Sequence, residues 1–178
     1  MSLLDEVAGL LTGRGIDVAV IGAAALAAHG VSRATADLDL LVVDLAVLDD
    51  EVWSDIRAAG DEVEVRRGDE ADPLAGVVRV AREGDASVDV IVGKAAWQRD
   101  LLRRASSTRV VDTELPVVAA SDLVLLKLYA GGPQDAWDID QLLNVDPGIA
   151  AQVEAGLGSL PADCADLWRS ILERRRRA

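Results

Sequence analysis

The chain has 178 residues, 51% of them hydrophobic and 28% charged, which fits one domain with enough apolar surface to bury a core. Within these residues we expect no second large domain, and the composition argues against wholesale disorder. Acidic residues outnumber basic ones by 31 to 18, giving a net charge of −13. Such a field repels phosphate backbones, so a protein that coats nucleic acid in general is not expected.

The cysteine, histidine and apolar content of the chain further restricts the kinds of metal site and the location that we expect. With one cysteine, Cys164, and one histidine, His29, the chain can form neither an internal disulfide nor a His/Cys zinc site. Carboxylates are therefore the remaining metal ligands. The longest apolar runs, such as 18–28, are shorter than the ~20 residues that cross a bilayer, and no basic region precedes an apolar one at the N-terminus. We expect a cytoplasmic protein without membrane contact.

The first half of the chain alternates between helical and extended patterns. Helical segments place apolar residues three and four positions apart, strands are short β-branched runs, and glycines separate them. The elements predicted here are, in order, a helix over 2–11, a strand over 18–21, a helix over 23–28, a strand over 36–43 and a helix over 48–59. A strand, a helix and a second strand thus form one compact unit.

The second half contributes more strands and then only helices. The charged stretch 61–72 is predicted to be an edge strand or a solvated loop, and 82–85 is predicted to turn a hairpin between strands over 77–80 and 88–92. The elements predicted after the hairpin are a basic helix over 95–105, extended segments at 109–111 and 115–116, a helix over 122–130 with Ser121 as its N-cap, and two or three more helices.

These patterns predict an α/β (α+β) protein with a small mixed sheet backed by helices and followed by a C-terminal helical layer. We place the sheet-containing core at 1–119 and the helical layer at 120–178. The two parts are expected to form one compact unit.

The most informative stretch is 36–43, where two aspartates interrupt an apolar strand. Because side chains alternate along a strand, Asp37 and Asp39 point to one side while Leu38 points to the core. Two like charges this close need a positive charge between them, and Mg²⁺ prefers hard oxygen ligands. Asp89 interrupts a second apolar strand that the hairpin can place beside the first, and it would complete a two-metal site. The alternative is that Asp37 and Asp39 cap the start of the strand and that Asp89 lies at a sheet edge.

Two segments before the aspartates are candidates for contact with phosphate. Gly22 and Ala23 join a strand to a helix, where free backbone N–H groups and a small side chain let phosphate oxygens approach. Small residues at such a joint are as often there for tight packing. Arg33, just before the aspartates, either meets a substrate phosphate or anchors the loop.

Lys127 is the only cation within an otherwise apolar helix, and an unpaired buried ammonium is costly. It therefore needs an anion. A nucleotide phosphate is one candidate; Asp135, Asp138 or an outward bend of the lysine stem to solvent are the others. Asp135 and Asp138, one helical turn apart, can equally well cap the helix that follows.

Two basic patches interrupt the acidic surface and allow a local contact with RNA. The residues are Lys94, Arg99, Arg103 and Arg104 in the first patch and 174–177 in the second. For the second patch, solvated arginines that complement the dipole of a terminal helix are the stronger interpretation.

The segment from Val20-Ile21-Gly22-Ala23 to Asp37-Leu38-Asp39 resembles the N-terminal signature of the polymerase-β-like nucleotidyltransferase superfamily, a glycine turn followed by Asp-x-Asp on the next strand. Gly30 and Arg33-Ala34-Thr35 are similar to the prokaryotic branch of AbiEii-type toxins and related small nucleotidyltransferases. A looser similarity continues through Lys127 and 135–138, so the match spans roughly 18–145.

The resemblance implies a nucleotidyltransferase-type sheet and an enzyme that moves a nucleoside monophosphate from an NTP to an acceptor hydroxyl of a tRNA, a protein or a small molecule, in a toxin-like role with a cognate antitoxin as partner. Asp37, Asp39 and Asp89 would be catalytic and hold two Mg²⁺ ions with the NTP. The nucleotide would be bound by Gly22, Ala23, Arg33 and Lys127.

Ala23 departs from the family pattern, because members often carry serine or a second glycine there and alanine offers no hydroxyl to a phosphate. This residue supports an alternative function: a catalytically weak or inactive nucleotidyltransferase-fold protein that acts as a binding or regulatory partner in a toxin–antitoxin type pair.

Overall fold

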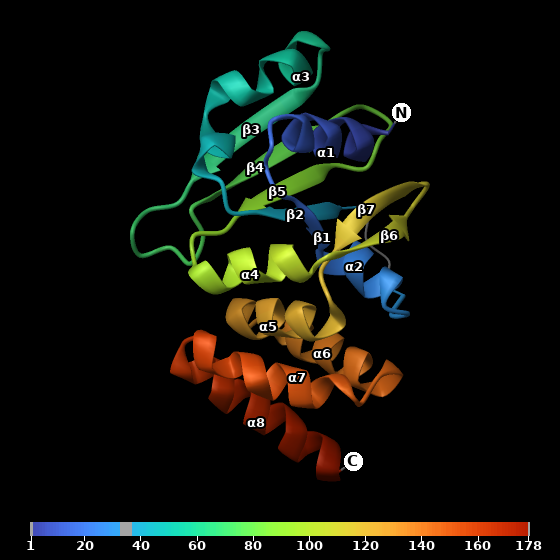
Figure 1. Cartoon of the computed structure of the whole chain (residues 1–178), viewed down its shortest axis with the longest axis vertical. Helices are drawn as coiled ribbons and strands as arrows, with labels where there is room; N and C mark the ends of the chain where they lie inside the picture. The colour runs from blue at the N-terminus through green and yellow to red at the C-terminus, as the bar shows by residue number, and fades with distance from the viewer. Residues whose placement is uncertain (1, 33–36, 178) are drawn as a thin grey trace.

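A seven-stranded mixed sheet runs through the molecule in the strand order β3-β4-β5-β2-β1-β7-β6 (Figure 1). The computed structural model describes residues 2–32 and 37–177. β1 pairs with β7 and β2 with β5 in parallel, and the other neighbours are antiparallel. The strands are β1 (Ala19–Ile21), β2 (Leu38–Val42), β3 (Glu62–Arg67), β4 (Gly76–Ala81), β5 (Val88–Val92), β6 (Ser106–Val110) and β7 (Thr113–Val117).

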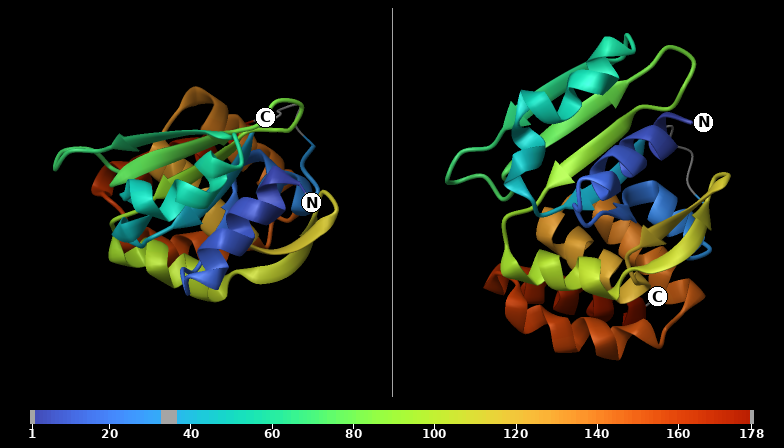
Figure 2. Two further views of the ribbon diagram at one scale, coloured as in Figure 1. Left: turned by 90° about the horizontal axis from the view of Figure 1, so that it is seen from above. Right: turned by 45° about the horizontal axis from the view of Figure 1, so that its top comes forward.

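Some helices pack on the sheet, and the C-terminal helices form a separate layer (Figure 1). α1 packs on β5, and the segment from η1 to α3 packs on β3, β4 and β5. α4 lies between the sheet and α5, and α5 to α8 make up the layer farthest from β3 in Figures 1 and 2. The helices are α1 (Leu3–Gly13), α2 (Gly22–Ala28), α3 (Ser54–Ala58), α4 (Ala96–Arg104), α5 (Ala120–Ala130), α6 (Pro133–Val145), α7 (Ile149–Gly156) and α8 (Ala162–Arg177), with 3₁₀ turns η1 (Leu45–Leu48), η2 (Asp50–Trp53) and η3 (Leu157–Ser159).

The predicted fold class is confirmed, including the mixed sheet, the β4–β5 hairpin and the all-helical C-terminal part. Of the two alternatives for 61–72, the structure has an edge strand, which covers Glu62–Arg67. α5 begins at Ala120, and the division into a core over 1–119 and a helical layer over 120–178 stays a prediction. None of the helices in the described part of the chain combines the length and the apolarity that a bilayer crossing requires.

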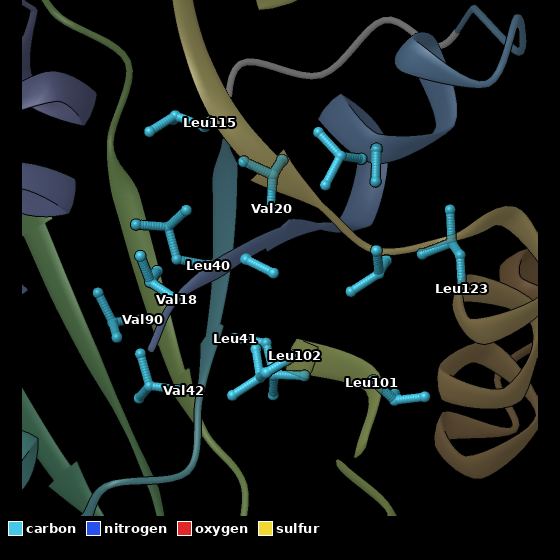
Figure 3. Packing of buried hydrophobic residues seen from close by; sticks show 14 of the residues in the cluster. Val18, Val20, Leu40, Leu41, Val42, Val90, Leu101, Leu102, Leu115 and Leu123 are labelled. Atoms are coloured by element: carbon cyan, nitrogen blue, oxygen red, sulfur yellow. The ribbon is translucent and has the colours of Figure 1, made fainter. Parts of the chain in front are cut away.

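The core is mostly aliphatic, and along β4 and β5 it packs against one face of the sheet. On β4, Val78 and Val80 are fully buried, whereas Arg79 between them is partly exposed on the opposite face. Leu40 of β2 and Val90 of β5 belong to the same buried side, as Figure 3 shows. Burial of each such side chain contributes about 1.5–3 kcal/mol, which fixes the register of these strands because a shift by one residue would expose the whole set. The polar residues of the opposite face are therefore held at defined positions.

Two local predictions are wrong. The helix expected over 48–59 is divided into 3₁₀ turns and the short α3, and the indole N–H of the fully buried Trp53 donates to the Val47 carbonyl across this bend at 2.7 Å. Ser121 does not cap α5. The Leu123 N–H donates to the Ala119 carbonyl at 2.9 Å, so the helix starts earlier and Ser121 lies inside its first turn.

Arg82, at the end of the β4 segment, connects α1 to the start of β3. Its guanidinium donates to Asp61 through Nε at 2.8 Å and Nη2 at 2.6 Å, and Nη2 also lies 2.5 Å from a carboxylate oxygen of Glu6. The Asp61 side chain is only 6% exposed, and the hydrogen bonds from Arg82 lower its pKa. This ion pair therefore favours folding only while Asp61 is ionised.

We expect Arg82→Met to change how stability depends on pH. Because the folded pKa of Asp61 lies below its unfolded value of about 3.9, the contribution is complete above that value and is lost as the pH falls through the folded pKa. Urea unfolding of the wild type and of Arg82→Met should differ most at about pH 7, and the difference should shrink as the pH falls below about 3.9. A difference that stays constant over this range would mean that the ion pair does not contribute.

Candidate active site

Gly22, where β1 meets α2, makes the closest approach to an acidic side chain. Ile21 pairs with Asp39 across the antiparallel β1–β2 ladder, which places the Asp39 carboxylate against the next residue, Gly22. A Cβ atom added to Gly22 would lie 1.9 Å from Asp39 Oδ2, and the φ angle of Gly22 is +61°. The joint requires glycine both for its backbone conformation and for the space that the carboxylate occupies.

Asp39 and Asp89 stand side by side on parallel strands. β2 and β5 are adjacent, and the two residues are partners in the register of the ladder. Asp37 lies two positions before Asp39, directly ahead of β2, so that the three residues gather at one end of neighbouring strands. The juxtaposition expected from the hairpin is thus confirmed for Asp39 and Asp89, and the metal-binding role stays a prediction.

Arg79 of β4 completes this group with a positive charge. β4 and β2 flank β5, and Arg79 pairs with Asp89 in the β4–β5 ladder. Its Nη2 donates to Asp37 Oδ1 at 2.9 Å, and its Nε lies 3.5 Å from Asp89 Oδ1. Ser87 joins the group, because its hydroxyl donates to Asp37 Oδ1 at 2.7 Å and accepts from Arg79 Nη2 at 3.1 Å. The guanidinium therefore lies between two of the three carboxylates.

The side chain of Asp89 is more buried than those of Asp37 and Arg79, and its environment is unfavourable for a negative charge. Its side chain is 19% exposed, against 52% for Asp37. Burial raises the pKa of Asp89, the charge of Asp37 raises it further, and the guanidinium of Arg79 opposes both effects. Asp89 Oδ1 is buried and has no hydrogen-bond partner among the described residues. An oxygen in this condition gains from a nearby cation.

The three aspartates have the oxygen ligands that Mg²⁺ prefers, but in this structure two of them contact the guanidinium of Arg79. Within residues 2–32 and 37–177, no group of three or more His, Cys, Asp or Glu side chains is arranged to hold a metal ion. Asp37, Asp39 and Asp89 nevertheless offer hard oxygen atoms from neighbouring strands, one of them buried without a hydrogen bond. The set fits a divalent cation on the condition that Arg79 gives up its position.

Lys127, which we assigned to the nucleotide, has two carboxylate partners within the helical layer. Its Nζ lies 2.5 Å from Asp138 Oδ2 and 3.2 Å from Asp135 Oδ1. Asp138 is fully buried, and Asp135 also accepts a hydrogen bond from the Gly132 N–H at 3.1 Å at the start of α6. These two residues supply the anion that the lysine requires, so the contact with phosphate stays a prediction. Arg33, the other basic residue assigned to the nucleotide, lies outside the described residues.

Three residues of the basic patch at and before α4 have polar partners, and two of these partners are aspartates. Lys94 donates to the backbone carbonyls of Asp69 and Glu70, Arg103 is 3.3 Å from Asp100, and Arg104 is 2.8 Å from Asp122. A cavity of about 420 Å³ lies beside this patch, between α4, α5 and α7, and none of the three candidate aspartates lines it. The backbone carbonyls do not neutralise the charge of Lys94, and an RNA contact at this patch stays a prediction.

Arg79 and Ser87 were not identified from the sequence. The available signal was a lone arginine in the β-branched run 77–80 opposite a lone aspartate in the run 88–92. A four-residue turn at 82–85 would pair Arg79 with Val88, whereas the observed register pairs it with Asp89. A shift of one residue moves a side chain to the other face of the sheet, so the length of this turn decides whether the two charges meet.

The fold of the chain is shared with nucleotidyltransferases. A lincosamide antibiotic adenylyltransferase, LnuA, solved with lincomycin bound, is 16% identical, with a TM-score of 0.52 over 80% of this chain and 95% of that one. An antigenic nucleotidyltransferase-like protein from Paracoccidioides brasiliensis is 16% identical, with a TM-score of 0.52 over 94% of this chain and 90% of that one. The antibiotic-resistance factor ANT(2'')-Ia is 15% identical, with a TM-score of 0.51 over 98% of this chain and 91% of that one. No family model and no curated protein sequence matches the chain.

Proposed function

We propose that this chain, which has the fold of nucleotidyltransferases, transfers a nucleoside monophosphate from an NTP to an acceptor hydroxyl and releases pyrophosphate. The observation that carries the proposal is the grouping of Asp37, Asp39 and Asp89 at adjoining strand ends, with Asp39 pressed against the glycine that starts α2. The resemblance of this same segment to the superfamily signature supports it.

In-line transfer of a phosphoryl group depends on positioning and on neutralisation of charge, so no protein nucleophile is needed. Asp37, Asp39 and Asp89 would hold Mg²⁺, which supplies charge neutralisation at the phosphates and acidifies the acceptor hydroxyl. Asp89 is assigned to the acceptor side of the site. Gly22 and Ala23 are assigned to the triphosphate through their backbone, since the Ala23 side chain is buried. Arg33 and Lys127 keep the nucleotide-binding role that the resemblance implies.

A small molecule is the acceptor that we favour. The net charge of −13 disfavours a tRNA, whose backbone it repels. LnuA, a protein of this fold, is an adenylyltransferase of lincosamide antibiotics. A toxin-like role with a protein or tRNA acceptor, and an antitoxin partner, rest on the resemblance to the AbiEii-type branch.

Transfer can be tested with each of the four NTPs labelled at the α-phosphate, because the label then stays with the transferred group. The full chain would be incubated with Mg²⁺ and, separately, with hydroxylated antibiotics, total tRNA or total protein. We expect a labelled small-molecule product that falls at least about 100-fold in Asp39→Asn, since the neutral amide has no negative charge with which to hold Mg²⁺. Asp55→Asn, at an exposed aspartate on α3, should transfer at the wild-type rate. Equal transfer by both variants would place the chemistry elsewhere.

The position of Arg79 supports the second candidate function, a weak or inactive regulatory partner. A guanidinium bound to Asp37 and close to Asp89 already neutralises part of the site. This candidate predicts no labelled product with any NTP and no Mg²⁺-dependent nucleotide binding in the same experiment.

A further inference from the structure

The guanidinium of Arg79 stands where the proposed function needs a divalent cation. It donates to Asp37 Oδ1 at 2.9 Å and approaches Asp89 Oδ1 to 3.5 Å, so a single cation already lies between two proposed metal ligands. A metal ion and a guanidinium cannot share this space, because like charges at such a distance repel.

We propose that Arg79 is an internal competitor of the divalent cation. In the metal-free protein it holds Asp37 and Asp89 in place, and it releases Asp37 when the cation binds. Arg79 is thus a positioning residue that sets how much metal the site requires. This inference rests on the proposed function, because it takes Asp37, Asp39 and Asp89 to be the metal ligands.

The backbone that carries Arg79 is rigid, whereas the guanidinium has room to move. Val78 and Val80 on either side are fully buried, and Asp89 and Glu64 are its register partners on the neighbouring strands. The Arg79 side chain itself is 37% exposed. Its contact with Asp89 is long for a charge-assisted hydrogen bond, and Asp89 Oδ1 has no hydrogen-bond partner among the described residues. The guanidinium therefore satisfies Asp89 incompletely and can withdraw toward solvent.

Arg66 on β3 provides a matched control. It lies on the same face of the sheet as Arg79, because it pairs with Val77 in the β3–β4 ladder, two residues before Arg79. Its Nε lies 3.2 Å from Glu64 Oε1, its side chain is 60% exposed, and its charge also lowers the pKa of Asp89. Loss of Arg66 removes the same charge from the same face without removing a contact with Asp37 or Asp89.

The experiment is a titration of the full chain with Mn²⁺ alone, with free Mn²⁺ measured by electron paramagnetic resonance. We expect Arg79→Met to bind Mn²⁺ about tenfold more tightly than the wild type, because one opposing charge a few Å from the ion is removed while the side-chain stem is kept. Arg79→Lys should stay close to the wild type. Arg66→Met should change the affinity less than about twofold, since exposed charges act weakly across solvent. Asp89→Asn should lose the bound ion.

An unchanged or weaker affinity in Arg79→Met, with Mn²⁺ still bound at a site that requires Asp89, would overturn this inference and leave the proposed function standing. Equal gains in Arg79→Met and Arg66→Met would also overturn it, because a general field would then explain both. If no variant binds Mn²⁺ at Asp89, the inference and the metal-dependent function fail together. Should Arg79→Met not fold by circular dichroism, Ser87→Ala replaces it: removing the hydroxyl that bridges Arg79 and Asp37 should still tighten Mn²⁺ binding severalfold, and no gain would overturn the inference.

Discussion

Gly22→Ala is expected to lower the free energy of unfolding by about 2–5 kcal/mol and to abolish nucleotidyl transfer. A φ angle of +61° is strained for any residue with a Cβ atom, which costs about 1–2 kcal/mol. The new methyl group would also lie 1.9 Å from Asp39 Oδ2 and 3.0 Å from Asp39 Cβ, so the carboxylate must turn away, at a further cost of about 1–3 kcal/mol. Urea unfolding and the labelled-NTP assay measure the two effects.

Gly15→Ala separates backbone strain from the contact with Asp39. Gly15 has a φ angle of +76°, similar to Gly22, but nothing lies within 4 Å of an added Cβ atom. We expect it to lose only about 1–2 kcal/mol and to keep full activity. If the two variants lost the same stability and the same activity, Gly22 would be required for the turn alone and the close approach to Asp39 would have no functional weight.

The acidic pair could be predicted because it depends only on features that are local in the sequence. Asp39 lies between two leucines at the start of an apolar strand, and Asp89 lies on a second, alternating strand that a nearby hairpin brings into the same sheet. The glycine at the β1–α2 joint was identified for the same reason, although its contact with Asp39 depends on the antiparallel register of β1 and β2. The alternation of side chains along strands and the positions of turn residues therefore predict which charged side chains lie close together.

Which charges pair could not be predicted, because this depends on register and on contacts that are distant in the sequence. Arg79 meets Asp89 only through the length of the β4–β5 turn, and it meets Asp37 across 42 positions of the chain. For Lys127, the sequence left phosphate, Asp135, Asp138 and solvent open, and the packing of α5 against α6 places both aspartates within reach of the ammonium. Ser121 was misassigned because a serine before an apolar run predicts a cap only where the preceding residues are not already helical.

Lys127→Met is expected to lower the free energy of unfolding by about 3–5 kcal/mol. The Lys127 side chain is 8% exposed and that of Asp138 is 0% exposed, so the variant leaves a buried carboxylate without the ammonium that lies 2.5 Å away. For a chain of 178 residues this corresponds to a fall in Tm of about 6–20 °C. Differential scanning calorimetry measures the change.

Arg169→Met is the matched control, because it removes one cation from an exposed pair. Arg169 lies 2.7 Å from Asp166, and their side chains are 65% and 74% exposed. We expect its loss to cost less than about 1 kcal/mol, since water solvates the remaining carboxylate. A loss below about 1 kcal/mol in Lys127→Met as well would show that the buried pair is not structural. If the folded Lys127→Met protein then bound NTP at least about tenfold more weakly than Arg169→Met, the ammonium would act on the phosphates and its aspartate partners would be the residues that position it.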